Sequence, residues 1–111
     1  MSILDEQSDL EAIIRYFKSQ PDIDPNRIVL IGESQGGLVS ALTAANMHKD
    51  VEKLVLVFPA LCIPDNWNKR YPKESDIPET TNIWNVPLGR HFFMELRNMD
   101  VFKTIRKFKK P

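Results

Sequence analysis

The stretch that decides the fold of this chain is residues 28–37, which read Ile28-Val29-Leu30-Ile31-Gly32-Glu33-Ser34-Gln35-Gly36-Gly37. Four apolar residues, three of them β-branched, come first and favour a short strand. The residues that follow, up to His48, are compatible with a helix. Glycines stand two positions before and two positions after Ser34, so the spacing is G-x-S-x-G. We therefore predict a strand over 28–31, a sharp turn at Ser34 and a helix over about 36–48.

A serine in such a turn is the sequence signature of a nucleophile elbow, which holds the serine hydroxyl up out of the sheet. The backbone at such a serine is strained, and the close passage of the chain predicts that glycine is needed at Gly32 and Gly36. We predict Ser34 as the nucleophile and the backbone N–H of Gln35 as an oxyanion donor, helped by the helix dipole. Glu33 is expected to be structural. The alternative is a glycine-rich turn in which Ser34 is only a helix N-cap.

The flanking sequence predicts an α/β fold. Apolar residues recur on one helical face over residues 3–17, with Ser2 or Asp5 as the cap and Pro21 as the stop. Residues 54–58 form an unbroken apolar run, which is typical of a strand covered on both faces in a parallel sheet. Helices alternate with strands through short links, so we expect parallel strands with right-handed connections.

Residues 62–100 differ from the rest of the chain in composition and in hydrophobic periodicity. They contain prolines and both tryptophans, and their hydrophobic periodicity is weak. Such a length without clear elements suggests an ordered cap over the site. Its aromatic residues could line a pocket for an aromatic group or could simply form core; they are Trp67, Tyr71, Trp84 and Phe92. The predicted organisation is a central core over 1–61, a cap insert over 62–100 and a helix returning to the core over 101–111.

Composition narrows the classes of partner. Lysine plus arginine and aspartate plus glutamate both number 15 in 111 residues, so the net charge is near zero. This balance points to neither a nucleic-acid nor a membrane partner, and we recognise no signal peptide. No metal cluster or phosphate loop stands out, and we expect no cofactor. The single cysteine, Cys62, is compatible with the cytoplasm and is expected to be buried. Oligomeric state stays open.

Residues 24–38 resemble the elbow region of the α/β-hydrolase fold, so the chain is similar to part of that fold. Within the fold they most resemble small bacterial esterases of the cinnamoyl (feruloyl) type. The similarity lies in the G-x-S-Q-G-G form, in Phe58-Pro59-Ala60 at a strand end, and in Ile63-Pro64 within the insert. The segment 102–111 is similar to the helix that precedes the strand bearing the acidic triad member.

The resemblance implies a Ser-Asp-His hydrolase of small-molecule esters, in which Ser34 forms an acyl-enzyme. In this fold the triad follows the order Ser, Asp or Glu, His, so the Asp and His are expected beyond Pro111. His48 lies on the same predicted helix as Ser34, about 21 Å along its axis, and cannot reach it. His91 falls in the cap region and needs an orienting carboxylate to act as a base. The chain is therefore expected to be an internal segment of a hydrolase of roughly 240 to 260 residues.

Two other hypotheses stay open. A serine peptidase or acyl-peptide hydrolase shares the elbow, and an upstream propeller or a pocket for a free amino terminus would favour it. Alternatively, the chain is a non-catalytic truncated product that at most binds a partner through its exposed sheet edge. A stop codon after Pro111 in an intact locus would favour this last possibility.

Overall fold

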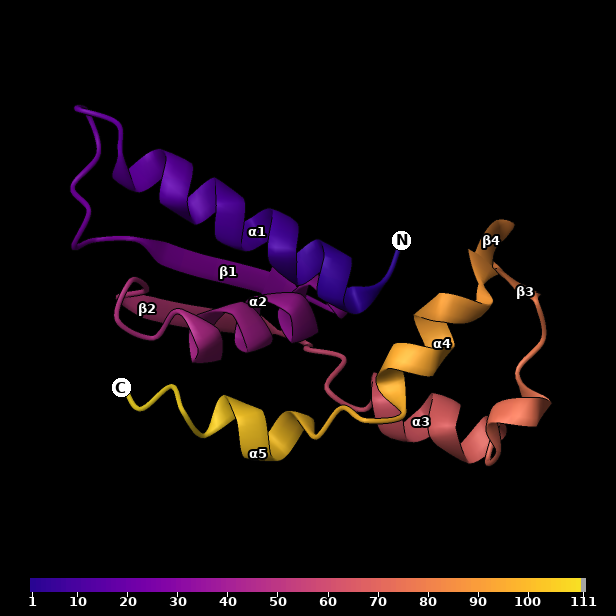
Figure 1. Cartoon of the computed structure of the whole chain (residues 1–111). Helices are drawn as coiled ribbons and strands as arrows, with labels where there is room; N and C mark the ends of the chain where they lie inside the picture. Colours follow the sequence, from indigo (N-terminus) through magenta and orange to yellow (C-terminus); the bar gives the residue numbers. More distant parts are fainter. Residues whose placement is uncertain (111) are drawn as a thin grey trace.

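The computed structural model describes residues 1–110, which form an elongated body of about 48 × 24 × 21 Å. The first half contains α1 (Ile3–Lys18), β1 (Val29–Glu33), α2 (Gln35–Asn46) and β2 (Lys53–Val57). The second half contains α3 (Ile63–Arg70), a 3-10 turn (Glu74–Asp76), β3 (Thr80–Ile83), β4 (Val86–Gly89), α4 (Arg90–Leu96) and α5 (Val101–Ile105). Figure 1 shows α3, α4 and the β3–β4 hairpin beyond one end of the β1–β2 sheet, whereas α5 returns alongside α2.

The first half is a β–α–β unit preceded by a helix. Strands β1 and β2 pair in parallel, with Val29 opposite Lys53 and Glu33 opposite Val57. The predicted strand therefore begins one residue later and runs two residues further, directly into α2. The hydroxyl of Ser2 caps α1 by accepting a hydrogen bond of 3.1 Å from the N–H of Asp5. The prediction of a partial α/β-hydrolase fold is confirmed at the level of fold class.

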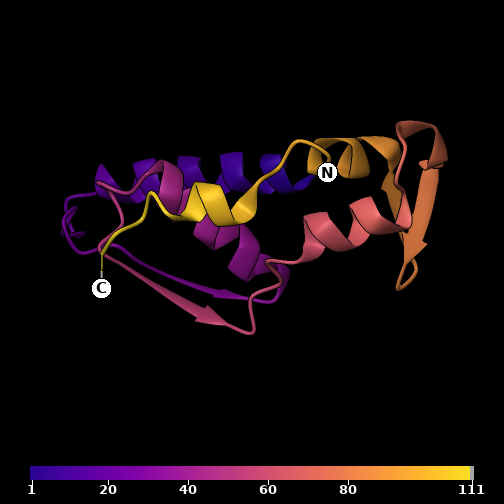
Figure 2. The ribbon, with the colours of Figure 1, turned by 90° about the horizontal axis from the view of Figure 1, so that it is seen from below.

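Helices cover only one face of the β1–β2 sheet in the part of the chain that the structure describes (Figure 2). Leu30 and Gly32 point toward α1 and α2 and are buried, whereas Val29 and Ile31 face away, and Ile31 is 71% exposed. Strand β2 alternates between exposed and half-buried residues. The expectation that the run 54–58 is covered on both faces is therefore wrong for residues 1–110, because a single helical layer packs on this sheet.

The second half is more regular than its weak periodicity predicted. It contains a hairpin and three α-helices, whose apolar side chains join those of the first half in one core. This core consists of Ile3, Leu38, Val39, Leu42, Ile77, Phe92, Phe93, Leu96 and Val101. A smaller cluster lies between α1, β1 and α2 and consists of Ile14, Leu30, Ala44 and Val51. Residues on both sides of the predicted boundary between core (1–61) and cap (62–100) therefore pack in the same core.

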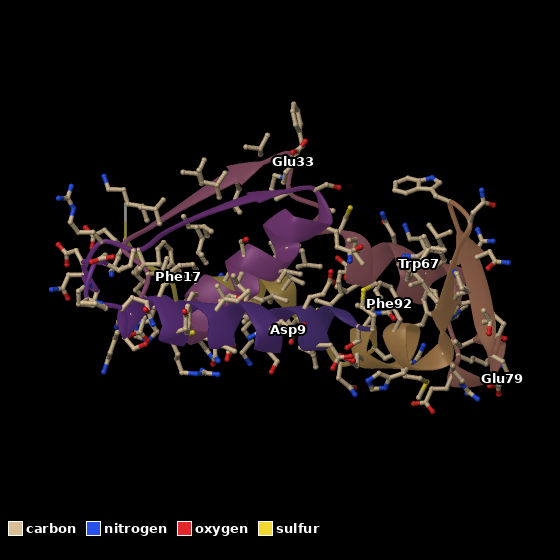
Figure 3. The ribbon with its side chains drawn as sticks, turned by 90° about the horizontal axis from the view of Figure 1, so that it is seen from above. Asp9, Phe17, Glu33, Trp67, Glu79 and Phe92 are labelled. Carbon is tan, nitrogen blue, oxygen red and sulfur yellow. The ribbon has the colours of Figure 1, made fainter. Side chains whose placement is uncertain are left out.

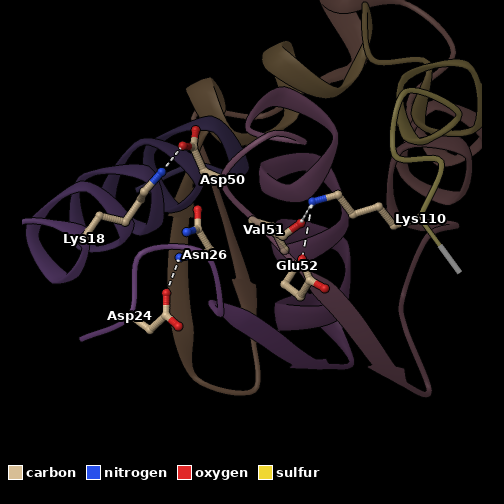
Figure 4. Close-up of polar contacts among 7 residues, drawn as sticks. All are labelled: Lys18, Asp24, Asn26, Asp50, Val51, Glu52 and Lys110. Carbon is tan, nitrogen blue, oxygen red and sulfur yellow. Dashed lines mark hydrogen bonds and ion pairs between the residues drawn. The ribbon is translucent and has the colours of Figure 1, made fainter. Parts of the chain in front are cut away.

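Polar contacts hold the loops at the far end of the β–α–β unit (Figure 4). Lys18, in the last turn of α1, pairs with Asp50 in the loop after α2. Lys110 donates a hydrogen bond of 2.8 Å to the carbonyl of Val51, which brings the end of the described chain back to the start of β2. The turn before β1 is closed by Asp24, whose side chain accepts a hydrogen bond of 2.9 Å from the N–H of Asn26.

The prediction that Cys62 is buried is wrong. Its side chain is exposed, because the residue stands at the N-cap position of α3, where the chain leaves the core. Asn66, one turn further along α3, places its Nδ2 atom 3.4 Å from the Cys62 sulfur. The thiol therefore faces solvent and contributes nothing to the two apolar clusters.

Candidate functional site

Ser34 lies between the carboxyl end of β1 and the first residue of α2, held by backbone hydrogen bonds on both sides. Its N–H donates to the carbonyl of Val57 at 3.1 Å, and its carbonyl accepts from Ala60 at 2.8 Å and from Gly37 at 3.0 Å. Two of these three bonds come from the end of β2 and the segment after it. The backbone of the turn is therefore fixed by the neighbouring strand, while the Ser34 side chain stays exposed.

The backbone of Ser34 occupies a region that favours glycine, with φ 53° and ψ −122°. For a residue with a Cβ atom such a conformation costs on the order of 1–3 kcal/mol. Ser34 stands at the N-cap position of α2, but its hydroxyl makes no capping hydrogen bond. The alternative in which this serine is only a cap is therefore not favoured, since strain is present without the bond that a cap provides.

Two glycines are required around the turn, but they are not the pair that the motif suggested. A Cβ atom on Gly32 would lie 2.5 Å from the carbonyl oxygen of Gly36, and one on Gly37 would lie 2.8 Å from Pro59. At Gly36 a Cβ atom would meet nothing within 4 Å. The predicted need for glycine at Gly36 is wrong, because this position faces open space, whereas Gly37 packs against the segment after β2.

Among the described residues, the side chain of Gln35 is hydrogen-bonded, whereas its backbone N–H is not. Its side-chain amide donates to the carboxylate of Glu6 at 2.8 Å, which ties it to the first turn of α1. Within residues 1–110 its backbone N–H carries no hydrogen bond, because the first helical bonds of α2 start from Gly37 and Leu38. An N–H at the amino end of a helix is a ready donor to an anion. Glu33, by contrast, ends β1 with an exposed side chain.

Neither histidine is brought to Ser34. His48 follows the carboxyl end of α2, at the opposite end of that helix from Ser34. His91 has the orienting carboxylate that sequence reasoning missed: its Nε2 lies 2.9 Å from Glu95, one helical turn away in α4. The i, i+4 spacing could have revealed this pair. Figure 2 shows, however, that α4 lies beside the amino end of α1 and not over the end of β1.

Three of the four aromatic residues predicted for a pocket pack as core instead. Trp67 stacks on Tyr71 with ring centroids 5.8 Å apart and meets the edge of Phe93 at 4.9 Å. Phe92 contacts Phe93 in turn, and Figure 3 shows Trp67 on α3 and Phe92 on the neighbouring α4. The fourth residue, Trp84, lies apart from this cluster and is 94% exposed.

Within residues 1–110 no group of three or more histidine, cysteine, aspartate or glutamate side chains is arranged to hold a metal ion. None of the helices in the same range combines the length and the apolar character needed to cross a membrane.

A comparison with known protein families finds a match that covers the Ser34 turn. The profile of the family described as acetyl xylan esterase (AXE1) matches residues 7–70. This stretch is more than half of the chain and runs from within α1 through the Ser34 turn to the end of α3. The match supports a serine esterase-type hydrolase family, which is a coarser assignment than the cinnamoyl or feruloyl type.

Proposed function

The chain belongs to the acetyl xylan esterase family, and we propose on this premise that Ser34 is the nucleophile of a carboxylic ester hydrolase. The observation that carries the proposal is the backbone of Ser34. It is held at φ 53° between a strand and a helix, with its side chain exposed and no capping bond. Strain of this kind persists only where surrounding structure enforces it, and it concentrates at functional sites.

The proposed reaction is acyl transfer through Ser34. Its Oγ attacks the ester carbonyl carbon while a histidine takes the hydroxyl proton, and the carbonyl oxygen becomes an oxyanion. The free N–H of Gln35, at the amino end of α2, donates a hydrogen bond to that oxyanion. Collapse of the intermediate releases the alcohol, which takes the proton from histidine. Water then hydrolyses the acyl-Ser34 ester by the same two steps.

The acid and base of this triad are assigned to polypeptide outside residues 1–111. Among the described residues, His48 and His91 both lie away from Ser34, and His91 is already paired with Glu95. A base must come within hydrogen-bond reach of the nucleophile. The chain alone should therefore show no Ser34-dependent ester turnover.

The acyl group is the finer part of the proposal. The family name favours acetyl esters of a sugar polymer, whereas the sequence resemblance favours hydroxycinnamoyl esters. The aromatic residues Trp67, Tyr71 and Phe92 are engaged in core packing, which leaves them unsuited to line an aromatic acyl pocket. We therefore propose that the acyl group is small, of the acetyl class.

The test compares p-nitrophenyl acetate with methyl ferulate, using a polypeptide in which these residues continue to the predicted Asp and His. We expect preference for the acetyl ester and a loss of about 10⁴-fold or more in kcat for Ser34→Ala. Ser8→Ala, which replaces an exposed serine of α1, is the matched control and should leave the rate unchanged. Unchanged turnover in Ser34→Ala would refute the assignment of the nucleophile, and cleavage of peptide amides in place of esters would favour the peptidase alternative.

A further inference from the structure

The turn between β3 and β4 contains a second strained position, occupied by a tryptophan. Ile83 pairs with Val86, so the turn consists of Trp84 and Asn85, with φ of 50° and 64°. Two positive φ values define a type I′ turn, which glycine and asparagine favour. Asn85 suits its position, but a left-handed conformation costs Trp84 about 1–2 kcal/mol.

Packing of the Trp84 side chain does not offset this backbone strain. It is 94% exposed, whereas Trp67 stacks on Tyr71 and joins the core. Burying an indole is among the largest apolar contributions that a side chain can make. A tryptophan that destabilises its turn and contacts no core has no role in the stability of the described chain, so its indole faces are free for an external ligand.

The surroundings of Trp84 select the kind of ligand. Residues 80–89 contain no charged side chain, and the amide side chains of Asn82 and Asn85 are exposed on the same hairpin as the indole. Nucleic acid is disfavoured, because no cation is available on the hairpin to contact phosphate. A hairpin of this size also offers little of the about 800 Å² per partner that a standard protein interface buries.

A flat aromatic face flanked by neutral amides matches the chemistry of a neutral sugar ring. The C–H groups on one face of a pyranose can lie against the indole, and amide groups can both donate to and accept from its hydroxyls. Figure 2 shows the β3–β4 turn pointing to the same side of the molecule as the β1–β2 sheet, whose carboxyl end carries Ser34. A polymer that lies against the hairpin can therefore extend toward the end of the sheet at which Ser34 lies.

We propose that Trp84, with Asn82 and Asn85, is a binding platform for a neutral pyranose chain, separate from the ester-cleaving site. The proposal rests on the proposed function for the identity of the polymer as the ester-bearing substrate. The platform retains the glycan chain, while Ser34 acts on its acyl group.

The test measures binding alone, with the full 111-residue chain and xylohexaose or insoluble xylan as probes. Depletion onto xylan gives the affinity, and the indole N–H signals of Trp67 and Trp84 in NMR spectra show which ring responds. We expect the Trp84 signal to shift, Trp84→Ala to weaken binding about tenfold or more, and Trp84→Tyr to retain most of it. Tyr16→Ala removes an exposed aromatic ring from α1 and should bind like the wild type.

Ser34→Ala separates this proposal from the proposed function, because it abolishes the nucleophile and should leave xylan binding unchanged. Equal binding by Trp84→Ala and wild type overturns the platform, as does the absence of any binding by a folded wild-type chain. Sedimentation velocity of the wild type and of Trp84→Ala tests whether the indole is instead a contact between protein chains. If the wild type self-associates and Trp84→Ala is a monomer with unchanged glycan affinity, the indole is a protein contact and the proposal fails.

Discussion

The side-chain amide of Gln35 donates a hydrogen bond of 2.8 Å to the carboxylate of Glu6. The two residues are 29 positions apart, and the bond connects the residue after Ser34 to the first turn of α1. Helix α1 therefore does more than cover the sheet, since it also restrains the start of α2. The geometry of the Ser34 turn therefore depends on β1, on β2 with the segment that follows it, and on α1.

A double-mutant cycle should measure this restraint. A partly buried hydrogen bond to a charged acceptor contributes about 1.5–3 kcal/mol, so we expect Glu6→Ala and Gln35→Ala each to lower the free energy of unfolding by about 1 kcal/mol or more. Their combination should be less than additive by about 1 kcal/mol. Urea denaturation provides the values. Asp9→Ala, which removes an exposed acid of the same helix (Figure 3), is the control and should change stability by under about 0.5 kcal/mol. Strict additivity would show that the two side chains do not interact.

Alanine substitutions at three glycines should separate crowded positions from open ones. At Gly32 and Gly37 the new methyl group would approach backbone atoms or Pro59 to 2.5–2.8 Å, so we expect losses of about 3 kcal/mol or more, or failure to fold. At Gly36 the methyl group meets open space inside α2, and alanine should stabilise by up to about 1 kcal/mol. Thermal denaturation followed by circular dichroism ranks the variants. A destabilised Gly36→Ala together with a tolerated Gly37→Ala would contradict the packing around Pro59.

The outer face of the β1–β2 sheet should drive association of the isolated chain. Ile31 is the most exposed apolar residue of the two strands, so Ile31→Thr keeps a β-branched side chain while removing apolar surface. We expect unfolding free energy within about 0.5 kcal/mol of the wild type and weaker concentration-dependent association in sedimentation velocity. Leu30→Thr, at the adjacent buried position, should instead cost about 2 kcal/mol or more. If Ile31→Thr associates as strongly as the wild type, another surface of the chain mediates the association.

Local patterns in the sequence predicted the β–α–β unit well, because strand, turn and helix there are encoded by adjacent residues. Ser2 as the cap of α1 and the strand–turn–helix around Ser34 needed no information from distant parts of the chain. The exposed outer face of β2 could not be predicted in this way. An unbroken apolar run has the same sequence whether one helical layer covers it or two, and only packing decides between them.

The residues of the candidate site could be predicted from the sequence, but the contacts that hold them in place could not. The motif identifies Ser34 and Gln35, yet it does not reveal that Glu6 restrains Gln35 or that Gly37 is the crowded glycine. Both relationships join segments distant in sequence, through a hydrogen bond and through contact with Pro59. The proposed role of Trp84 could not be predicted from the sequence either. A tryptophan in a proline-rich segment is expected to be a core residue, and only its turn conformation indicates otherwise.

Replacing Trp84 with glycine should stabilise the hairpin. The turn sequence would become Gly-Asn, which suits the two positive φ values, and the strain of about 1–2 kcal/mol would be released without loss of packing. Part of the gain is offset by the greater freedom of glycine in the unfolded chain, so we expect a net increase of about 0.5–1 kcal/mol in urea denaturation. Asn85→Ala is the opposing control and should destabilise, since alanine accepts positive φ less readily. A loss of stability in Trp84→Gly would mean that the indole contributes to the fold after all.

The strain at Ser34 should be visible in the order of stability of two variants. Ser34→Ala removes the hydroxyl but keeps the Cβ atom at φ 53°, so its free energy of unfolding should be close to that of the wild type. Ser34→Gly removes the Cβ atom as well and should exceed Ser34→Ala by about 1 kcal/mol, the strain released less the entropy cost of glycine. Chemical denaturation of the three proteins at matched pH gives the comparison. If alanine is the more stable of the two, the turn relaxes in solution, and the backbone strain that supports Ser34 as a nucleophile is absent.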